Sequence, residues 1–400
     1  MQKLIKNDKT LTLFAIGIFI YMCINNDLCL TWILPTSFMY VGGILIPLFC
    51  GYITRTRKLT VVHLFTFLYF VYYWLLHPSI YQFLGSASMI ISIYSILALP
   101  LASKRVLLEQ LKSFFTFFIA ISLLWWGLYM AGVSLPYENV SVNDFHNNVN
   151  NYYLFSTSAD SSRYHFFNRF SGMFLEAGQM ATPCVFFIFS NGASLKDRRN
   201  WVLLVAILLS FSLVAYIMLA VGYLLKSILY NRKHLFLKVF IPVSIFIAAG
   251  AVITKNANEN NPLYIMILSR LEADDDKIIA GNNRTNDYVD YRYDRMMKSS
   301  DKYFGISSEI SRSNDDWTYS SSGYKKYIIH NGLIGLLLLS LLFYSFYKKN
   351  KSMYNSIILM LAILAFIPRS MLTKGMWLFP ILLGFYYNGN SLNHRISSNG

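Results

Sequence analysis

Arg169 and Glu176 lie in a segment that could carry acid–base and anion chemistry, Arg169-Phe-Ser-Gly172-Met-Phe-Leu-Glu176-Ala-Gly178. The segment opens an apolar stretch, where an ionisable group at a helix centre costs roughly 2.5–3.5 kcal/mol and is usually functional. A carboxylate can accept a proton from a hydroxyl, and a guanidinium can bind phosphate oxygens. Their seven-residue spacing predicts that Arg169 and Glu176 lie on one helix face, two turns apart, and that Gly172 leaves this face open. The alternative is that both side chains anchor the helix or pair with other helices.

A long polar segment, Thr254 to Tyr327, carries a second set of charged and phenolic side chains. Between Asp287 and Lys298 these residues recur every three or four positions, which predicts a helix with Arg292 and Arg295 on one face. Such a guanidinium pair can grip a phosphate through parallel hydrogen bonds. Pairing of these arginines with neighbouring aspartates on a solvated face is an equally open interpretation.

Several other residues complete the candidate set because they are cationic, phenolic or titrate near neutral pH. His330 could accept a proton or, more commonly for an interfacial histidine, bond a backbone carbonyl. Arg369 could attract an anionic headgroup or extend toward the membrane surface. The catalytic candidates are Glu176, Arg169 and Arg284, and the substrate-binding candidates are Arg292, Arg295, Arg163, His330, Tyr288 and Arg369.

Metal and cofactor chemistry has no support in the sequence. No CxxC motif occurs, and no pair of histidines has helical ligand spacing. We therefore expect neither a metal nor a cofactor.

These residues must be positioned by a membrane-embedded scaffold. Hydrophobic residues make up 55% of the chain and charged residues only 14%, with a mean hydropathy of +0.42, as is typical of a polytopic membrane protein. We expect an all-α integral membrane protein of about twelve transmembrane helices. The predicted spans are Leu11 to Ile24, Leu28 to Ile53, Leu59 to Leu76, Ala87 to Ala102, Leu111 to Gly132, Phe170 to Ser190, Trp201 to Leu213, Val214 to Tyr230, Leu237 to Ile253, Ile328 to Tyr347, Asn355 to Met371 and Gly375 to Tyr387.

The stretch from Trp201 to Tyr230 decides the topology, because it is long for one crossing and short for two. Splitting it into two helices places 20 of the 35 basic residues on one side, accompanied there by only three acidic residues. Lys and Arg in short loops stay on the cytoplasmic side, so both termini are predicted to be cytoplasmic and both polar segments external. Bases scattered over many short loops also argue against a nucleic-acid partner.

The predicted organisation has five parts. Residues 1–134 hold the first five spans, 135–168 form the first periplasmic loop, and 169–253 hold the sixth to ninth spans. Residues 254–327 form the large, partly helical periplasmic loop, and 328–400 hold the last three spans and a cytoplasmic tail.

Three segments, in this order, resemble the O-antigen polymerase and ligase superfamily of bacterial membrane glycosyltransferases. The segment 169–178 is similar to the family's span of Arg, Gly and Glu followed by a small residue and Gly. Asn283-Arg284 through Tyr303-Phe304-Gly305 is similar to the family's loop arginine with a later glycine turn, and 322–335 resembles its return to the membrane with paired glycines. With the helix count and the dominant loop before the last three spans, the resemblance covers the whole chain.

The resemblance implies transfer of a glycan from undecaprenyl pyrophosphate onto the terminal sugar of another lipid-linked repeat unit, at the outer leaflet of the bacterial inner membrane. Arg169 and Arg284 would stabilise the leaving diphosphate, and Glu176 would act on the acceptor hydroxyl. The implied partners are undecaprenyl-pyrophosphate-linked oligosaccharides and membrane lipids, with a chain-length-determining membrane protein as a further candidate.

Two alternatives stay open. The ligases of the superfamily carry a His-Asn pair at a register that holds Ser321 here, and His330 lies too close to Gly332 to replace it, so polymerase ranks above ligase. A lipid-linked oligosaccharide flippase would also have about twelve spans, but it would bury charges through both halves and keep its outer loops short.

The sidedness is open to a direct test. In a variant lacking the four native cysteines, a single cysteine at Tyr288 or Trp317 should react with a membrane-impermeant thiol reagent in intact cells. A control cysteine at Lys351 should react only after lysis. The opposite pattern would invert the predicted topology.

Overall fold

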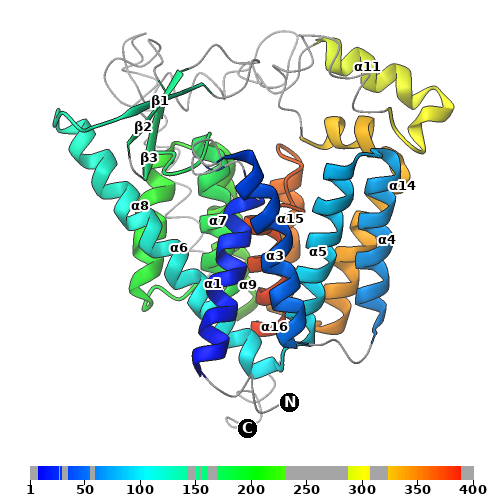
Figure 1. Ribbon diagram of the computed structural model, residues 1–400, viewed down its shortest axis with the longest axis horizontal. Coiled ribbons are helices and arrows are strands. Elements are labelled where there is room, and N and C mark those ends of the chain that lie inside the picture. The colour runs from blue at the N-terminus through cyan, green and yellow to red at the C-terminus, as the bar shows by residue number, and fades with distance from the viewer. Residues whose placement is uncertain are drawn as a thin grey trace.

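The computed structural model describes residues 8–26, 28, 35–54, 59–141, 149–153, 155–159, 169–230, 287–306 and 323–388. Most of these residues are helical, and the long helices run roughly parallel in one bundle (Figure 1). The helices are α1 (Asp8–Ile24), α3 (Thr36–Thr54), α4 (Val61–Leu76), α5 (Ile80–Ala98), α6 (Leu101–Met130), α7 (Ala177–Ser190), α8 (Arg198–Ser210), α9 (Leu213–Tyr230), α11 (Asp287–Met297), α14 (Gly323–Lys349), α15 (Met353–Phe366) and α16 (Gly375–Asn388), with a short 3₁₀ turn, η2 (Ser300–Lys302).

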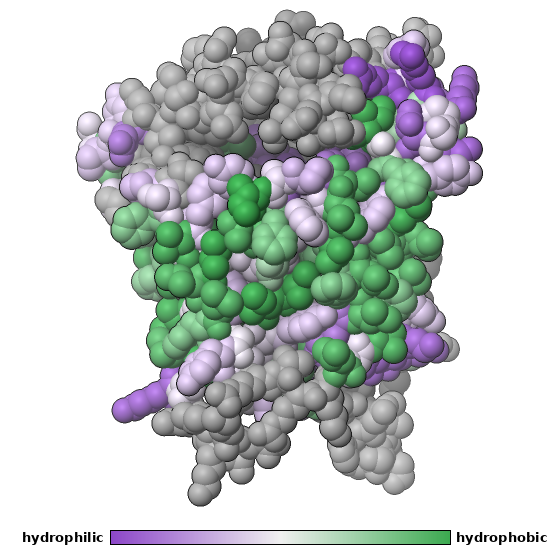
Figure 2. Space-filling model, turned by 45° about the vertical axis from the view of Figure 1, so that its right-hand side comes forward, coloured by the Kyte–Doolittle hydropathy of each residue, from purple (hydrophilic) through white to green (hydrophobic). Residues whose placement is uncertain are grey.

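The surface of this bundle fits a membrane. Within the described ranges, four helical stretches are long and apolar enough to cross a bilayer, and they are Ser37–Thr54, Ile80–Ala98, Leu101–Met130 and Gly323–Lys349. Five shorter apolar helices accompany them. On the face shown in Figure 2, an apolar belt crosses the middle of the molecule, with hydrophilic residues above and below it. The chain is therefore a membrane protein built mainly of helices.

A small sheet departs from the all-helical expectation. Strands β1 (Glu138–Ser141), β2 (Val149–Tyr153) and β3 (Ser156–Ala159) form an antiparallel sheet in the order β1-β2-β3 within the first predicted loop. The polar, Asn-rich sequence there lacks the alternation of a half-buried strand, so it carried no strand signal. The sheet and α11 both lie at one end of the bundle, which we call the sheet end (Figure 1).

The two-helix interpretation of Trp201 to Tyr230 is confirmed. Helix α8 ends at Ser210, Phe211 adopts a left-handed conformation with φ of 47°, and α9 begins at Leu213. Helix α6 begins earlier than predicted. The fifth span was expected from Leu111, whereas α6 begins at Leu101 and so includes Lys104 and Arg105. The predicted ninth span, Leu237 to Ile253, lies outside the described residues.

The centre of the bundle is formed by α7 and α16. Every residue of α7 is buried, and so is nearly all of α16. Helices that are apolar all round belong in a core. Gly384 lets the two axes approach, since a Cβ there would lie 2.7 Å from the Ser190 hydroxyl. That hydroxyl donates to the Pro380 carbonyl at 2.6 Å, so α7 and α16 are both closely packed and hydrogen-bonded to each other.

The opposite end of the bundle, which we call the basic end, is held by an ion network. Lys112 of α6 is fully buried and donates to Asp197 at 2.9 Å and to Asn191 at 3.0 Å. Arg199 bridges Asp197 at 2.8 Å and Glu109 at 2.5 Å. Burial alone would raise the pKa of Asp197, but hydrogen bonds from Arg199 and Lys112 and the Lys112 charge hold that pKa well below its ordinary value. The network therefore fixes the α7–α8 connection against α6.

Replacing Asp197 by Asn should lower the free energy of unfolding by about 3–5 kcal/mol, because Lys112 would keep a buried charge without its carboxylate. Adding Lys112→Met should recover most of that loss. Both changes can be measured by thermal unfolding in detergent. A wild-type melting temperature for Asp197→Asn would mean that the pair contributes nothing.

The same pair gives a pH prediction. A depressed folded-state pKa contributes stability that is complete above the unfolded value of about 4 and is lost as the pH falls through the lower folded value. The stability difference between wild type and Asp197→Asn should therefore stay constant from about pH 8 to about pH 5 and shrink only in stronger acid. A difference that already disappears near neutral pH would contradict the assignment.

Candidate functional site

The described residues place Glu176 against Arg369 at the sheet end of the bundle. Glu176 immediately precedes α7, as its N-cap residue, and Arg369 lies in the connection between α15 and α16. The Arg369 guanidinium donates through Nη2 to Oε2 of Glu176. The Arg369 side chain is only 9% exposed, whereas that of Glu176 is 48% exposed. A buried cation is thus paired with a carboxylate that reaches solvent.

Two glycines make room for the Arg369 segment. A Cβ at Gly178 would stand 2.9 Å from Nη2 of Arg369, so glycine lets the guanidinium lie against the first turn of α7 without shifting. At Gly323, the first residue of α14, a Cβ would overlap the backbone of Pro368 and Arg369. The Tyr324 amide also donates to the Ile367 carbonyl at 3.2 Å. Helices α7, α14 and α15 therefore converge on Arg369.

Arg169 does not share a helix face with Glu176, and that prediction is wrong. Residues 169–176 are not helical, because Gly172 turns the chain with φ of 56° and is packed rather than open. Arg169 instead donates to the carbonyls of Ser210 and Phe211 at 2.9 and 3.0 Å. These bonds satisfy the end of α8 at its left-handed turn, which supports the anchor interpretation for this arginine.

The glycine turn after α11 is locked into a break in α14. Helix α14 is interrupted at Gly332, whose φ of 65° and ψ of −176° are essentially restricted to glycine. Gly305 has φ of 79°, and a Cβ there would lie 2.7 Å from the Ile329 carbonyl. The Ile306 amide donates to that carbonyl at 2.6 Å. The two glycine segments of the family resemblance are therefore in direct contact.

The backbone groups freed by this break find partners nearby. The Tyr72 hydroxyl of α4 donates to the Asn331 carbonyl at 2.8 Å, and the Tyr327 hydroxyl donates to the Gly335 carbonyl at 3.1 Å. The Ile334 amide donates to the Tyr303 carbonyl at 3.1 Å. A broken helix at membrane depth is stable only when such groups are satisfied. The predicted single span from Ile328 is thus a broken helix.

His330 lies just before this break and faces α4. Its ring centre is 6.3 Å from that of His77, which closes α4. Its position supports a role near the break rather than in the ion pair.

Helix α11 forms as predicted and packs on the first half of α14. Val289 and Met296 are buried against Ile328 and Ile329. Asp290, one of the aspartates that neighbour these arginines in the sequence, accepts from Lys325 of α14 at 2.7 Å. Arg295 is exposed and Arg292 is half-buried. The helix thus holds both arginines at the sheet end, above the segment that meets Arg369.

The remaining candidates fall into two groups. Arg163 and Arg284 lie outside the described residues, and Tyr288 is within α11 although its side chain is not described.

Two polar residues near the site, Gln179 and Lys374, were not among the predicted site residues. These two side chains help line a cavity of about 10 Å³ between α7 and the connection to α16, with Asn26, Phe174, Met371 and Trp377. A buried Gln one turn after Glu176 was a weak signal in an otherwise apolar helix.

Chemically, the pair offers an anion-binding group and a proton acceptor at one position. An arginine bound to a carboxylate can exchange it for a phosphate, which it also binds through parallel hydrogen bonds. The released carboxylate would then be free to accept a proton. No group of three or more His, Cys, Asp or Glu with metal-site geometry occurs in the described part of the chain.

Comparison with known proteins adds no relative. No family model matches the chain, and neither a curated protein nor a solved structure matches it.

Alanine at Gly332 should destabilise the fold, because it would occupy a glycine-only conformation and overlap the Tyr303 carbonyl. The conformational part alone costs about 1–3 kcal/mol. Gly85→Ala is a matched control, since a Cβ there meets nothing within 4 Å in α5 and should be neutral or stabilising by up to about 1 kcal/mol. Thermal unfolding in detergent measures both. Equal melting temperatures for the two variants would contradict the interlock of Gly305 and Gly332.

Proposed function

We propose that this protein is a membrane glycosyltransferase that polymerises undecaprenyl-pyrophosphate-linked oligosaccharide repeat units into O-antigen or a related surface polysaccharide. The site would lie at the outer leaflet of the bacterial inner membrane, with both termini in the cytoplasm. The single observation that carries this proposal is the Glu176–Arg369 pair at the sheet end of the bundle. The resemblance of three sequence segments supplies the substrate class.

The proposed step follows from the chemistry of the pair. The acceptor sugar hydroxyl attacks the anomeric carbon of the donor glycan, and the bond from that carbon to the diphosphate oxygen breaks. Glu176 receives the hydroxyl proton, and Arg369 stabilises the negative charge that develops on the diphosphate. The donor brings its own leaving group, so the step needs no further reactant.

The arrangement around the pair supports an anionic, lipid-linked substrate. Arg369 is held where α14 and α15 meet the sheet end, and α11 holds Arg292 and Arg295 at that end as further cations. The Glu176 carboxylate is half-exposed, so a substrate could reach it without opening the core. Arg284 stays a candidate for the same leaving group.

The distribution of charge favours an enzyme over a flippase. The buried Lys and Arg side chains within the described ranges are Lys104, Lys112 and Arg369. Lys104 bonds the last turn of α5, Lys112 bonds the α7–α8 connection, and Arg369 lies in the α15–α16 connection, so all three are at helix ends. A flippase would be expected to carry charges through the depth of its passage. Placement of charge at the ends suits chemistry at a surface.

Glu176→Gln should abolish polymer formation at normal protein abundance, because the amide keeps the shape of the carboxylate but cannot accept the proton. A general base contributes on the order of 10²–10⁴ to a rate, so the surface glycan should fall to one repeat unit in the bacterial host. Arg369→Lys should do the same, since lysine keeps the charge but loses the parallel hydrogen bonds. Gel analysis of surface glycan measures each outcome.

The matched control is Arg198→Lys at the exposed start of α8, which should leave the polymer unchanged. Full-length polymer with Glu176→Gln would reject the proposed base. In a deletion strain, absence of any surface repeat unit would indicate a flippase, and polymer held on its lipid carrier would indicate a ligase.

A further inference from the structure

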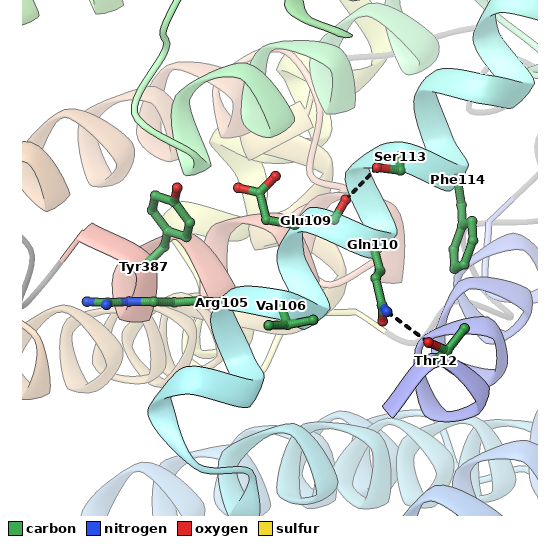
Figure 3. Close-up of a pocket in the computed structure, with 8 residues that line it drawn as sticks. All are labelled: Thr12, Arg105, Val106, Glu109, Gln110, Ser113, Phe114 and Tyr387. Carbon is green, nitrogen blue, oxygen red and sulfur yellow. Dashed lines mark hydrogen bonds between the residues drawn. The ribbon is translucent and has the colours of Figure 1, made fainter. Parts of the chain in front are cut away.

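A groove at the basic end lies between α1, α6 and α16 (Figure 3). It has a volume of about 560 Å³, within the range of roughly 300–1,000 Å³ that is usual for ligand sites. Six lining residues come from one face of α6, and Thr12 and Tyr387 complete it; the six are Arg105, Val106, Glu109, Gln110, Ser113 and Phe114. The groove is distinct from the Glu176–Arg369 site, which lies at the other end.

The groove changes from cationic to apolar along its length. Arg105 and Tyr387 stand at one end, and Phe114 and Thr12 stand at the other (Figure 3). Nine residues of helix separate Arg105 from Phe114, or about 13 Å along the axis. Val106 and Phe117, on the same face of α6, are 43% and 60% exposed, so the groove opens toward the apolar belt. A ligand with a charged head and an aliphatic body would fit this gradient.

Among the described residues, no carboxylate is left to pair with the positive charge at the head of the groove. Glu109 is the acidic residue of the lining, but its two oxygens accept from Asn191 at 2.8 Å and from Arg199 at 2.5 Å. Arg105 makes no ion pair with a described residue, and its buried Nε has no hydrogen-bond partner there. Gln110 donates to Thr12 at 3.0 Å, which leaves its buried Oε1 without a donor. A guanidinium without an anionic partner, such as that of Arg105, is suited to bind a phosphate group.

We propose that this groove binds an anionic phospholipid, with the lipid phosphate at Arg105 and one acyl chain along Val106 and Phe114. The basic end is the predicted cytoplasmic side, where anionic lipids concentrate and basic pockets between helices bind their headgroups. The occupied groove would fasten α1 and α16 to α6. This inference is independent of the proposed glycosyl transfer.

The test uses the purified full chain in detergent, titrated separately with dioleoylphosphatidylglycerol, dioleoylphosphatidylcholine and glycerol 3-phosphate and read by native mass spectrometry. Phosphatidylglycerol should bind about tenfold more tightly than phosphatidylcholine, and Arg105→Gln should remove that preference. Val106→Trp should fill the groove and weaken both lipids. Arg198→Gln removes an exposed charge at the same end, and Val205→Trp enlarges an exposed apolar residue of α8, so both controls should bind as wild type.

Three outcomes would overturn the inference. Equal binding of the two lipids would remove the role of charge, and an equal loss with Arg198→Gln would indicate general surface attraction. Binding of glycerol 3-phosphate that depends on Arg105 and displaces the lipid would identify a soluble phosphate site instead. Melting temperatures of the variants without lipid, each expected to equal the wild-type value, separate lost binding from lost folding.

Discussion

A charged or polar group is stable inside a membrane only where the protein supplies a partner for it. The three Lys and Arg residues that are buried as a whole in the described bundle follow this constraint. Lys112 is held by Asp197, Lys104 donates to the Leu97 carbonyl at 2.9 Å, and Arg369 is held by Glu176. The ends of the bundle are therefore where helices are tied to one another, and the apolar middle is left to packing.

Close backbone approach is the second requirement, and glycine provides it at the sheet end. Gly178 admits the Arg369 guanidinium, Gly323 admits the Arg369 backbone, and Gly305 and Gly332 interlock. Each contact joins segments far apart in the sequence. Because a Cβ at any of these positions would displace backbone or the guanidinium, the glycines fix where the charged groups stand.

Much of the scaffold could be predicted from the sequence, because hydrophobic length and basic loops are local signals. The two-helix division of Trp201 to Tyr230 followed from charge alone, and α11 followed from periodicity. The sheet formed by β1–β3 could not be predicted, since its polar strands have no alternation. For Arg169 the anchor interpretation, one of the two that the sequence left open, is the one that the structure supports. The prediction of a shared helix face required a continuous helix over the seven residues from Arg169 to Glu176. The positive φ of Gly172 breaks that helix.

The partner of Glu176 was beyond sequence reasoning for a different reason. Arg369 lies 193 positions away. Periodicity does not tell that the start of α7 contacts the connection between α15 and α16. Both residues had been singled out separately, because ionisable groups are rare in apolar stretches. The structure adds that the cation is buried while its carboxylate is half-exposed. That asymmetry matters, because a fully buried pair would resist exchange and a fully exposed one would be weak. A pair at this boundary can stabilise the fold, and its arginine can still exchange the carboxylate for an anion that it binds more tightly.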